Sequence, residues 1–222
     1  MKPTVGLCNI RNRPSVCQPD IIENGGRAVV TKTERAEATR SRLLKVGWDL
    51  FSEHGYDATS IEDVLESAGV SKGALYHHFA SKGALFEAVF IEGERDCMQK
   101  VAAAAMKEKD HVEKLRAGCQ TWLDLVMDRQ VRRVAVIDGP AVLGWQRWRE
   151  IDEEYAFGLT KKAIEHAMQA GKVRQQNADL VAHMTIAMLG EAAMLIARAS
   201  DPKAAREEAR ETIDRLIDAL VR

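Results

Sequence analysis

A short polar stretch between Ser71 and His78 carries residue types that bind nucleic acid without covalent chemistry. It combines a hydroxyl, an ammonium, a phenol and two imidazoles with the small residues Gly73 and Ala74. Lysine and tyrosine side chains contact phosphates, and side chains at the start of a recognition helix reach base edges in the major groove. Small residues let the backbone approach the DNA closely. These residue types therefore favour recognition of double-stranded DNA.

The sequence offers no catalytic motif beside this stretch. It contains no nucleophile elbow, no phosphate-binding loop and no set of metal ligands, and His77 and His78 lack a carboxylate at the HExxH spacing. The four cysteines form no C-x-x-C pair and match no zinc spacing. We interpret them as free thiols, with redox sensing as the alternative. We therefore expect a protein that is not an enzyme and that holds no metal and no cofactor.

Two short predicted helices, over 61–68 and 72–79, hold the polar stretch. Thr59 or Ser60 supplies an N-cap for the first helix, and Gly69 ends it. The apolar positions of the pair fit packing against a longer first helix, and they are Ile61, Val64, Leu65, Ala68, Val70, Leu75 and Phe79. Two short helices joined by a tight turn that contains glycine predict a helix-turn-helix, whose second helix lies in the major groove.

The rest of the chain predicts an all-α protein. No run of alternating apolar and polar residues indicates a sheet. We expect helix breaks at Gly139-Pro140, Gly171 and Asp201-Pro202. The other predicted helices cover residues 33–54, 82–105, 110–129, 131–138, 141–171, 177–199 and 203–221.

The composition is that of a soluble globular protein, with 46% hydrophobic and 29% charged residues. The net charge is only −1, so binding to DNA has to rest on the local placement of groups. From Thr31 to Lys82, seven basic residues minus eight acidic ones again leave −1, so Glu62, Asp63 and Glu66 must face away from DNA. No apolar run of about 18 residues predicts a membrane span, and the N-terminus lacks the apolar core of a secretion signal. We expect a cytoplasmic protein.

Residues 1–30 differ from the rest of the chain. They hold three of the five prolines and the sequence Asn24-Gly25-Gly26, and they show no helical period. We interpret them as a flexible N-terminal arm. One alternative is a gene start placed too early. The other is a basic arm that enters a minor groove through Arg11, Arg13 and Arg27.

The stretch from Arg42 to Phe90 closely resembles the DNA-binding domain of the tetracycline-repressor (TetR) family. The resemblance is carried by Leu50-Phe51, Gly55-Tyr56, Thr59-Ser60-Ile61, Ala68-Gly69-Val70-Ser71-Lys72-Gly73, Leu75-Tyr76-His77-His78-Phe79 and Ser81-Lys82 with Leu85-Phe86. This combination is far more specific than a generic helix-turn-helix. The residues from Asp138 to Trp145, with Trp148-Arg149, resemble a branch of the family with an unassigned ligand.

The resemblance implies a DNA-binding domain over 31–80 and a ligand-binding and dimerisation domain over 81–222. It also implies which side chains contact DNA, with the tyrosine and lysine positions mostly on phosphates. Base reading then falls to Lys72, Gly73, Ala74 and His77. The full set of candidate DNA-binding residues is Thr59, Ser60, Ser71, Lys72, Gly73, Ala74, Tyr76, His77, His78 and Lys82.

Two apolar stripes near the C-terminus indicate assembly into a homodimer. One consists of Leu180, Met184, Ala187, Met188, Ala192, Leu195 and Ile196, and the other of Ala209, Ile213, Leu216, Ile217 and Leu220. Two such helices from each subunit can form a four-helix interface with twofold symmetry, which matches a palindromic operator. The alternative is that the stripes pack only within one subunit.

Apolar and soft side chains of the C-terminal region are candidates for an effector cavity, although each of them also fits the core. The candidates are Phe90, Cys97, Trp122, Met127, Trp145, Met184, Met188 and Glu191. Glu191 lies within an apolar stripe, where an unpaired carboxylate is costly. We expect it to face a ligand amine or hydroxyl, or an arginine such as Arg198 at the dimer interface.

These observations and the resemblance predict a repressor that a small-molecule ligand releases from its operator. A ligand between the fourth helix and the body would change the spacing of two recognition helices, provided that it binds the DNA-incompetent state more tightly. Transcriptional activation remains open as a variant. A DNA-binding architectural or division-control protein without a ligand is the alternative from another class.

Overall fold

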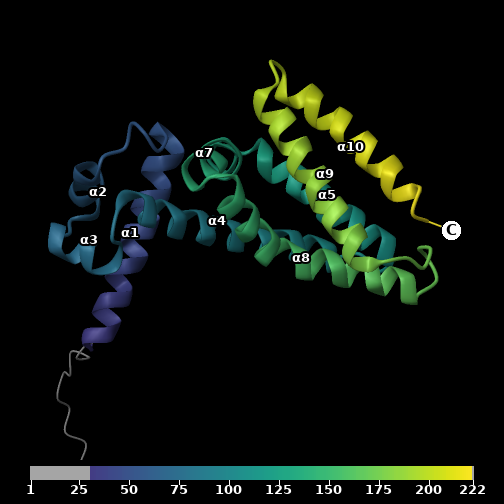
Figure 1. Ribbon diagram of the computed structural model, residues 1–222, viewed down its shortest axis with the longest axis horizontal. Coiled ribbons are helices and arrows are strands. Elements are labelled where there is room, and N and C mark those ends of the chain that lie inside the picture. The colour runs from purple at the N-terminus through teal and green to yellow at the C-terminus, as the bar shows by residue number, and fades with distance from the viewer. Residues whose placement is uncertain (1–30, 222) are drawn as a thin grey trace, which may run out of the picture.

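The computed structural model describes residues 31–221, so the predicted arm over 1–30 lies outside the described residues. Every named element of this part of the chain is a helix, which confirms the all-α prediction (Figure 1). The helices are α1 (Lys32–His54), α2 (Ile61–Ala68), α3 (Lys72–His78), α4 (Lys82–Ala105), α5 (His111–Met127), α6 (Arg129–Val131), the π-helix η1 (Arg132–Asp138), α7 (Gly139–Leu143), α8 (Trp145–Gln169), α9 (Ala178–Arg198) and α10 (Pro202–Asp218).

Side-chain caps set the ends of the first three helices. Thr31 and Ser60 each form a capping box, with Glu34 and Asp63 respectively. Gly69 ends α2 with a φ of 62°, a left-handed conformation that glycine adopts without strain. The predicted bounds of α2 are confirmed, and those of α1 and α3 are right to within one residue.

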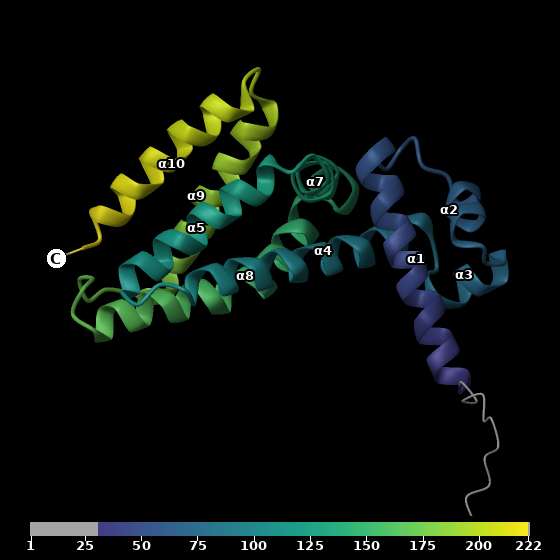
Figure 2. The same ribbon diagram turned by 180° about the vertical axis from the view of Figure 1, so that it is seen from behind.

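An aromatic cluster joins the three-helix unit to α4. The ring of Phe86 lies 5.3 Å from that of Phe51 and 5.2 Å from that of Tyr56, both in edge-to-face arrangements. Because Phe86 belongs to α4, the first turns of α4 share the core of α1–α3. α4 then runs on into the second group of helices, away from α1–α3 (Figures 1 and 2).

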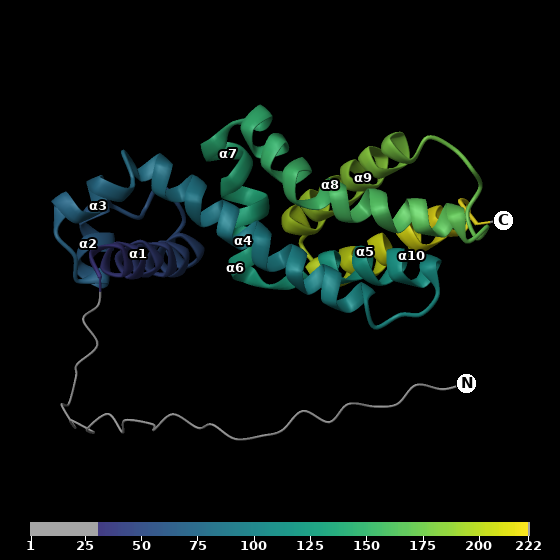
Figure 3. The ribbon, with the colours of Figure 1, turned by 90° about the horizontal axis from the view of Figure 1, so that it is seen from below.

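The second group consists mainly of α5, α8, α9 and α10. α5 packs against α4, α8, α9 and α10, and α8 packs along α9. Viewed from below, α1–α3 lie at one end of the molecule and this helical body at the other, with α4 leading from one to the other (Figure 3).

The expected break at Gly139-Pro140 and the expected continuous helix over 141–171 are wrong. The chain passes from η1 directly into α7, because Pro140 lies in the first turn of α7, where its missing N–H costs nothing. The real break is at Gly144, whose φ of 77° separates α7 from α8. Gly139 is instead required by packing, since an added Cβ would lie 2.8 Å from the ring of Phe90.

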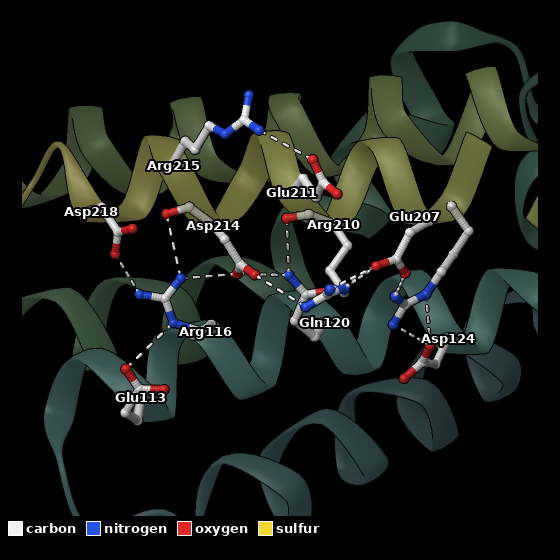
Figure 4. Close-up of polar contacts among 11 residues, drawn as sticks. Glu113, Arg116, Gln120, Asp124, Glu207, Arg210, Glu211, Asp214, Arg215 and Asp218 are labelled. Carbon is white, nitrogen blue, oxygen red and sulfur yellow. Dashed lines mark hydrogen bonds and ion pairs between the residues drawn. The ribbon is translucent and has the colours of Figure 1, made fainter. Parts of the chain in front are cut away.

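Charged side chains hold α10 against α5 along what we call the ionic seam (Figure 4). Arg116 of α5 contacts Asp214 at 2.9 Å and Asp218 at 2.6 Å, both on α10. Gln120 donates a hydrogen bond to Asp214 at 2.8 Å. The seam consists of Glu113, Arg116, Gln120 and Asp124 on α5 and Arg206, Glu207, Arg210, Asp214 and Asp218 on α10.

α9 is more apolar than we predicted from the sequence. By length and composition it could cross a membrane, with a mean hydropathy of 1.8, although we expected no such run. Only 33% of the apolar 18-residue stretch of α9 is buried, and Leu180, Met184 and Leu195 are exposed. Such a face on a helix that also packs against α8 and α10 is typical of a contact between subunits.

Candidate DNA interface and effector cavity

α3 presents a polar face to solvent. Leu75 is fully buried toward the core, whereas Lys72, Tyr76 and His77 are exposed. The hydroxyl of Ser71 accepts a hydrogen bond from the N–H of Ala74 at 3.2 Å and starts the helix. The exposed side chains thus lie on one rigid helix, held in place by its buried residues.

Gly73 has no internal reason to be glycine. Its φ is not positive, and a Cβ built on it meets no atom within 4 Å. Glycine within a helix costs about 1 kcal/mol relative to alanine. The missing side chain gives no packing advantage in the free protein. It does leave the backbone of α3 accessible to an external partner.

Two of the predicted DNA contacts face inward. The Thr59 side chain is buried, and its hydroxyl donates to the carbonyl of Gly55 at 2.8 Å. The ammonium of Lys82 donates to the carbonyls of Tyr56 and Thr59 at 2.9 and 3.0 Å and lies 4.1 Å from the Tyr56 ring centre. Both residues fasten the loop between α1 and α2, and we assign them to positioning that loop.

The end of α3 carries a second set of polar groups. The rings of His77 and His78 lie 5.2 Å apart, and burial, helped by His77 and Arg40, lowers the pKa of His78. Arg40 of α1 stacks on the ring of Phe79 at 5.5 Å. The sequence reading missed Arg40, because only the crossing of α1 and α3 brings it beside the recognition helix.

The acids of α2 remain close to this surface. Glu62 forms an exposed ion pair of 3.5 Å with Lys72. Asp63 is engaged in the capping box of α2, where hydrogen bonds from Ser60 lower its pKa. An exposed pair of this kind contributes little to stability, so Lys72 can exchange Glu62 for a phosphate at little cost.

A mostly apolar cavity of about 450 Å³ opens into the helical body. Its walls come from α4, α5, η1, α8 and α9. The lining residues are Glu94, Met98, Val101, Ala102, Ala105, Met106, Lys114, Leu115, Gly118, Cys119, Trp122, Ala135, Val136, Trp148, Asp152, Ala156, Leu159, Thr160, Lys162, Ala163, His166, Ile186, Leu189, Gly190 and Ala193. The volume suits a small organic molecule.

Of the eight predicted ligand residues, only Trp122 lines this cavity. Phe90 and Cys97 are buried in the core, and Met127 is half-buried outside the lining. Among those on α8 and α9, Met188 is half-buried, whereas the other three are exposed, and these are Trp145, Met184 and Glu191. The structure therefore does not bring the predicted set together.

The polar feature of the cavity is a pair of carboxylates that the sequence reading did not single out. Glu94 of α4 is 3% exposed, and its Oε2 has no hydrogen-bond partner. Asp152 of α8 has a buried, equally unpartnered Oδ2. One signal was available in the sequence, since Glu94 interrupts the apolar stripe formed by Phe90 and Cys97 on α4.

A partly buried contact connects the body to the three-helix unit. Asp138, at the end of η1, accepts a hydrogen bond from the backbone N–H of Tyr56 at 2.9 Å. Arg133 also contacts Asp138, at 3.2 Å, and its guanidinium packs on Gly55. Ala135 in the middle of η1 lines the cavity. The same short helix thus contacts both the cavity and the loop before α2.

A helix-turn-helix with an exposed polar recognition helix, joined to a helical body that contains a cavity, defines the class of DNA-binding transcriptional regulators. Comparison with protein families narrows this class. A family model described as "Bacterial regulatory proteins, tetR family" matches residues 43–89, and one described as "Tetracyclin repressor-like, C-terminal domain" matches residues 112–220. The chain belongs to the TetR family of transcriptional regulators, which confirms the resemblance.

Individual relatives agree with this assignment. The Transposon Tn10 TetC protein of Escherichia coli is 24% identical over 68% of this chain and 76% of its own length. The HTH-type transcriptional regulator UidR of E. coli K12 is 35% identical, but the match covers only 29% of this chain and 33% of UidR. A TetR-family transcriptional regulator from Pectobacterium atrosepticum, known from its crystal structure, is 27% identical in sequence. The two structures match with a TM-score of 0.79 over 86% of this chain and 97% of that protein. Regulators of this family bind operator DNA as homodimers and bind small-molecule effectors.

Proposed function

We propose that this protein is a cytoplasmic, non-enzymatic repressor that a small-molecule effector releases from its operator. One observation carries the proposal: the effector cavity is walled by α4, the helix that directly follows the recognition helix α3. A ligand that contacts α4 acts on a helix whose first turns share the core of the DNA-binding unit through Phe86. No separate relay is needed between the two sites.

The second route from the cavity to the DNA runs through η1. A ligand that displaces Ala135 also displaces the end of the same helix, where Asp138 accepts a hydrogen bond from the N–H of Tyr56. The effector shifts the population of states only as far as it binds the released arrangement more tightly. We assign Ser60, Ser71, Lys72, Gly73, Ala74, Tyr76, His77 and His78 to the DNA contact, with Arg40 beside them.

The exposed apolar face of α9 and α10 is the proposed dimer surface. Leu180, Met184 and Leu195 of α9 and Leu216 of α10 are large, apolar and exposed in the single chain. A twofold axis through this face joins two copies symmetrically, as a palindromic operator requires. The two α3 helices must then lie about 34–36 Å apart, so that they enter successive major grooves.

The first experiment is a mobility shift with the protein and the DNA upstream of its own gene, at a stated salt concentration. We expect a specific shift that Tyr76→Ala weakens. Tyr76→Phe is the matched control, because it keeps the ring and removes only the hydroxyl that would contact a phosphate. A shift that Tyr76→Ala leaves unchanged contradicts the assignment of α3. Footprints at many scattered genomic sites would instead favour an architectural protein.

A further inference from the structure

The cavity contains a carboxylate in an environment that does not suit it. Glu94 is buried among apolar groups, and its Oε2 accepts no hydrogen bond. Among residues 31–221, no ion pair reaches Glu94. A buried polar atom without a partner costs free energy, and a buried charge costs more. The fold alone gives Glu94 no compensation for this cost.

A second acid on the facing helix repeats the pattern. Asp152 of α8 also lines the cavity, and its Oδ2 lacks a hydrogen bond. Its nearest cation is Arg149, at 3.8 Å, and Arg149 lies closer to Glu153, at 3.2 Å. Asp152 is near enough to Glu94 to raise the pKa of Glu94 by charge repulsion. Two acids from α4 and α8 therefore line one cavity, and among residues 31–221 only Asp152 has an ion-pair partner, the distant Arg149.

We propose that the effector is an amphiphilic cation, whose positive group pairs with Glu94 and Asp152 and whose apolar part fills the remaining cavity. This inference rests on the effector cavity assigned above. Trp122 and Trp148 supply aromatic surface on the cavity wall, which suits an apolar body and adds cation–π attraction for the charged end. The ligand supplies the partner that the free protein lacks, so the carboxylates contribute to affinity and not to stability.

The basic groups of the cavity do not favour an anion at this position. Lys162 and His166 line the cavity but are exposed, and Lys114 on α5 is half-buried. None of the three forms an ion pair with Glu94 or Asp152. An anionic head near these groups would leave Glu94 without a partner and would add a further negative charge beside Asp152.

Binding of a permanent cation should depend on pH. Burial, together with Asp152, raises the pKa of Glu94 to about 8, and burial raises that of Asp152 to about 6 against the opposing effect of Arg149. Glu94 of the free protein thus keeps its proton at neutral pH and loses it when a cation binds. The affinity therefore rises with pH, by up to about tenfold per unit between pH 6 and 8, and levels off above pH 8. Two buried thiols nearby, those of Cys97 and Cys119, have pKa values raised to about 12 by burial and stay neutral in this range.

The test uses three probes with one alkyl chain: decyltrimethylammonium, 1-decanol and decanoate, all below their micelle concentrations. Binding to the full chain is followed by calorimetry at pH 6, 7 and 8 and by tryptophan fluorescence, to which Trp122 and Trp148 of the cavity contribute. At pH 8 we expect the cation to bind at least about tenfold more tightly than decanol, and decanoate to bind most weakly. The quaternary head does not titrate, so any pH dependence comes from the protein.

Variants separate the charge from the cavity. Glu94→Gln should lose about tenfold or more in affinity for the cation, and most of its pH dependence, while it binds decanol at least as well as the unmodified protein. Glu92→Gln, on the exposed side of α4, should change neither the affinity for the cation nor its pH dependence. Retained decanol binding shows that the variant is folded. Equal binding of the cation by Glu94→Gln and the unmodified protein, or tighter binding of decanoate than of the cation, overturns the proposal.

The two proposals fail in different ways. If the cation binds with the expected selectivity but leaves operator affinity unchanged, the ligand class stands and the release mechanism does not. If a neutral or anionic probe releases the operator and Glu94→Gln responds normally, the release mechanism stands and the ligand class is wrong.

Discussion

Replacement of Asp138 by alanine tests the contact between the body and the DNA-binding unit. The change removes the acceptor of the Tyr56 N–H, a hydrogen bond of 2.9 Å, and leaves that donor without its partner. An unsatisfied donor costs about 1–3 kcal/mol when it is buried, and this hydrogen bond is partly buried. The ion pair with Arg133 adds little, because the Arg133 side chain is 43% exposed. We therefore expect Asp138→Ala to weaken this junction by about 2 kcal/mol.

Amide hydrogen exchange at Tyr56 measures this loss directly. A local free energy lower by about 2 kcal/mol corresponds to exchange about thirtyfold faster. Asp138→Asn is the matched control, since its amide oxygen can still accept the hydrogen bond and only the charge is lost. It should cost less than about 1 kcal/mol.

Operator binding provides the second readout. If η1 transmits the effector signal, Asp138→Ala should reduce the difference in operator affinity with and without effector, whereas Asp138→Asn should retain most of it. Unchanged exchange at Tyr56 in Asp138→Ala, or an equal loss in both variants, would refute this account of the junction.

Four further predictions follow from single side chains. Gly73→Ala should raise the free energy of unfolding by up to about 1 kcal/mol in urea titrations and weaken operator binding, because the added methyl meets only the DNA. Lys82→Ala should destabilise the protein by about 1–3 kcal/mol, since two carbonyls lose a charged donor, and a loss of operator affinity without any loss of stability would contradict this. Leu195→Glu should convert dimers to monomers in analytical ultracentrifugation, because it places a charge on the exposed apolar face of α9. The free energy of unfolding should fall as pH rises from about 4.5 toward 8, because the unfolded chain releases the Glu94 proton at a pKa near 4.5 while the folded protein holds it until about 8. Glu94→Gln should flatten that decline.

The DNA-binding unit was predictable because its signals are local. Ser60 with Asp63 marks the start of α2, and Gly69 marks its end, all within ten residues of sequence. The inward orientation of Thr59 and Lys82 was not predictable in this way. Thr59 donates to the carbonyl of Gly55 only in the particular loop conformation that follows α1, and Lys82 depends on carbonyls of that loop more than twenty residues away along the chain.

The cavity was less accessible to sequence reasoning, because a helix pattern shows which side is apolar but not which neighbour covers it. Met184 and Glu191 lie on the exposed side of α9, whereas Ile186 and Ala193 of the same helix reach the cavity. The difference between these positions is a rotation about the helix axis, which the packing of α9 against α5, α8, α10 and η1 determines. Glu94 was accessible in principle, as a charge within a buried stripe.

The ionic seam between α5 and α10 affects how salt titrations of operator binding should be interpreted. The slope of affinity against salt is commonly converted to a number of phosphate contacts through counterion release. Here α10 carries part of the proposed dimer surface, and Arg116, Asp214 and Asp218 hold it in place through partly exposed charges that salt screens. Added salt thus weakens the contact between α5 and α10 as well as the binding of DNA. A covalently linked dimer would remove the contribution of subunit dissociation, and a shallower slope for it would show that salt acts on the dimer as well as on the phosphate contacts.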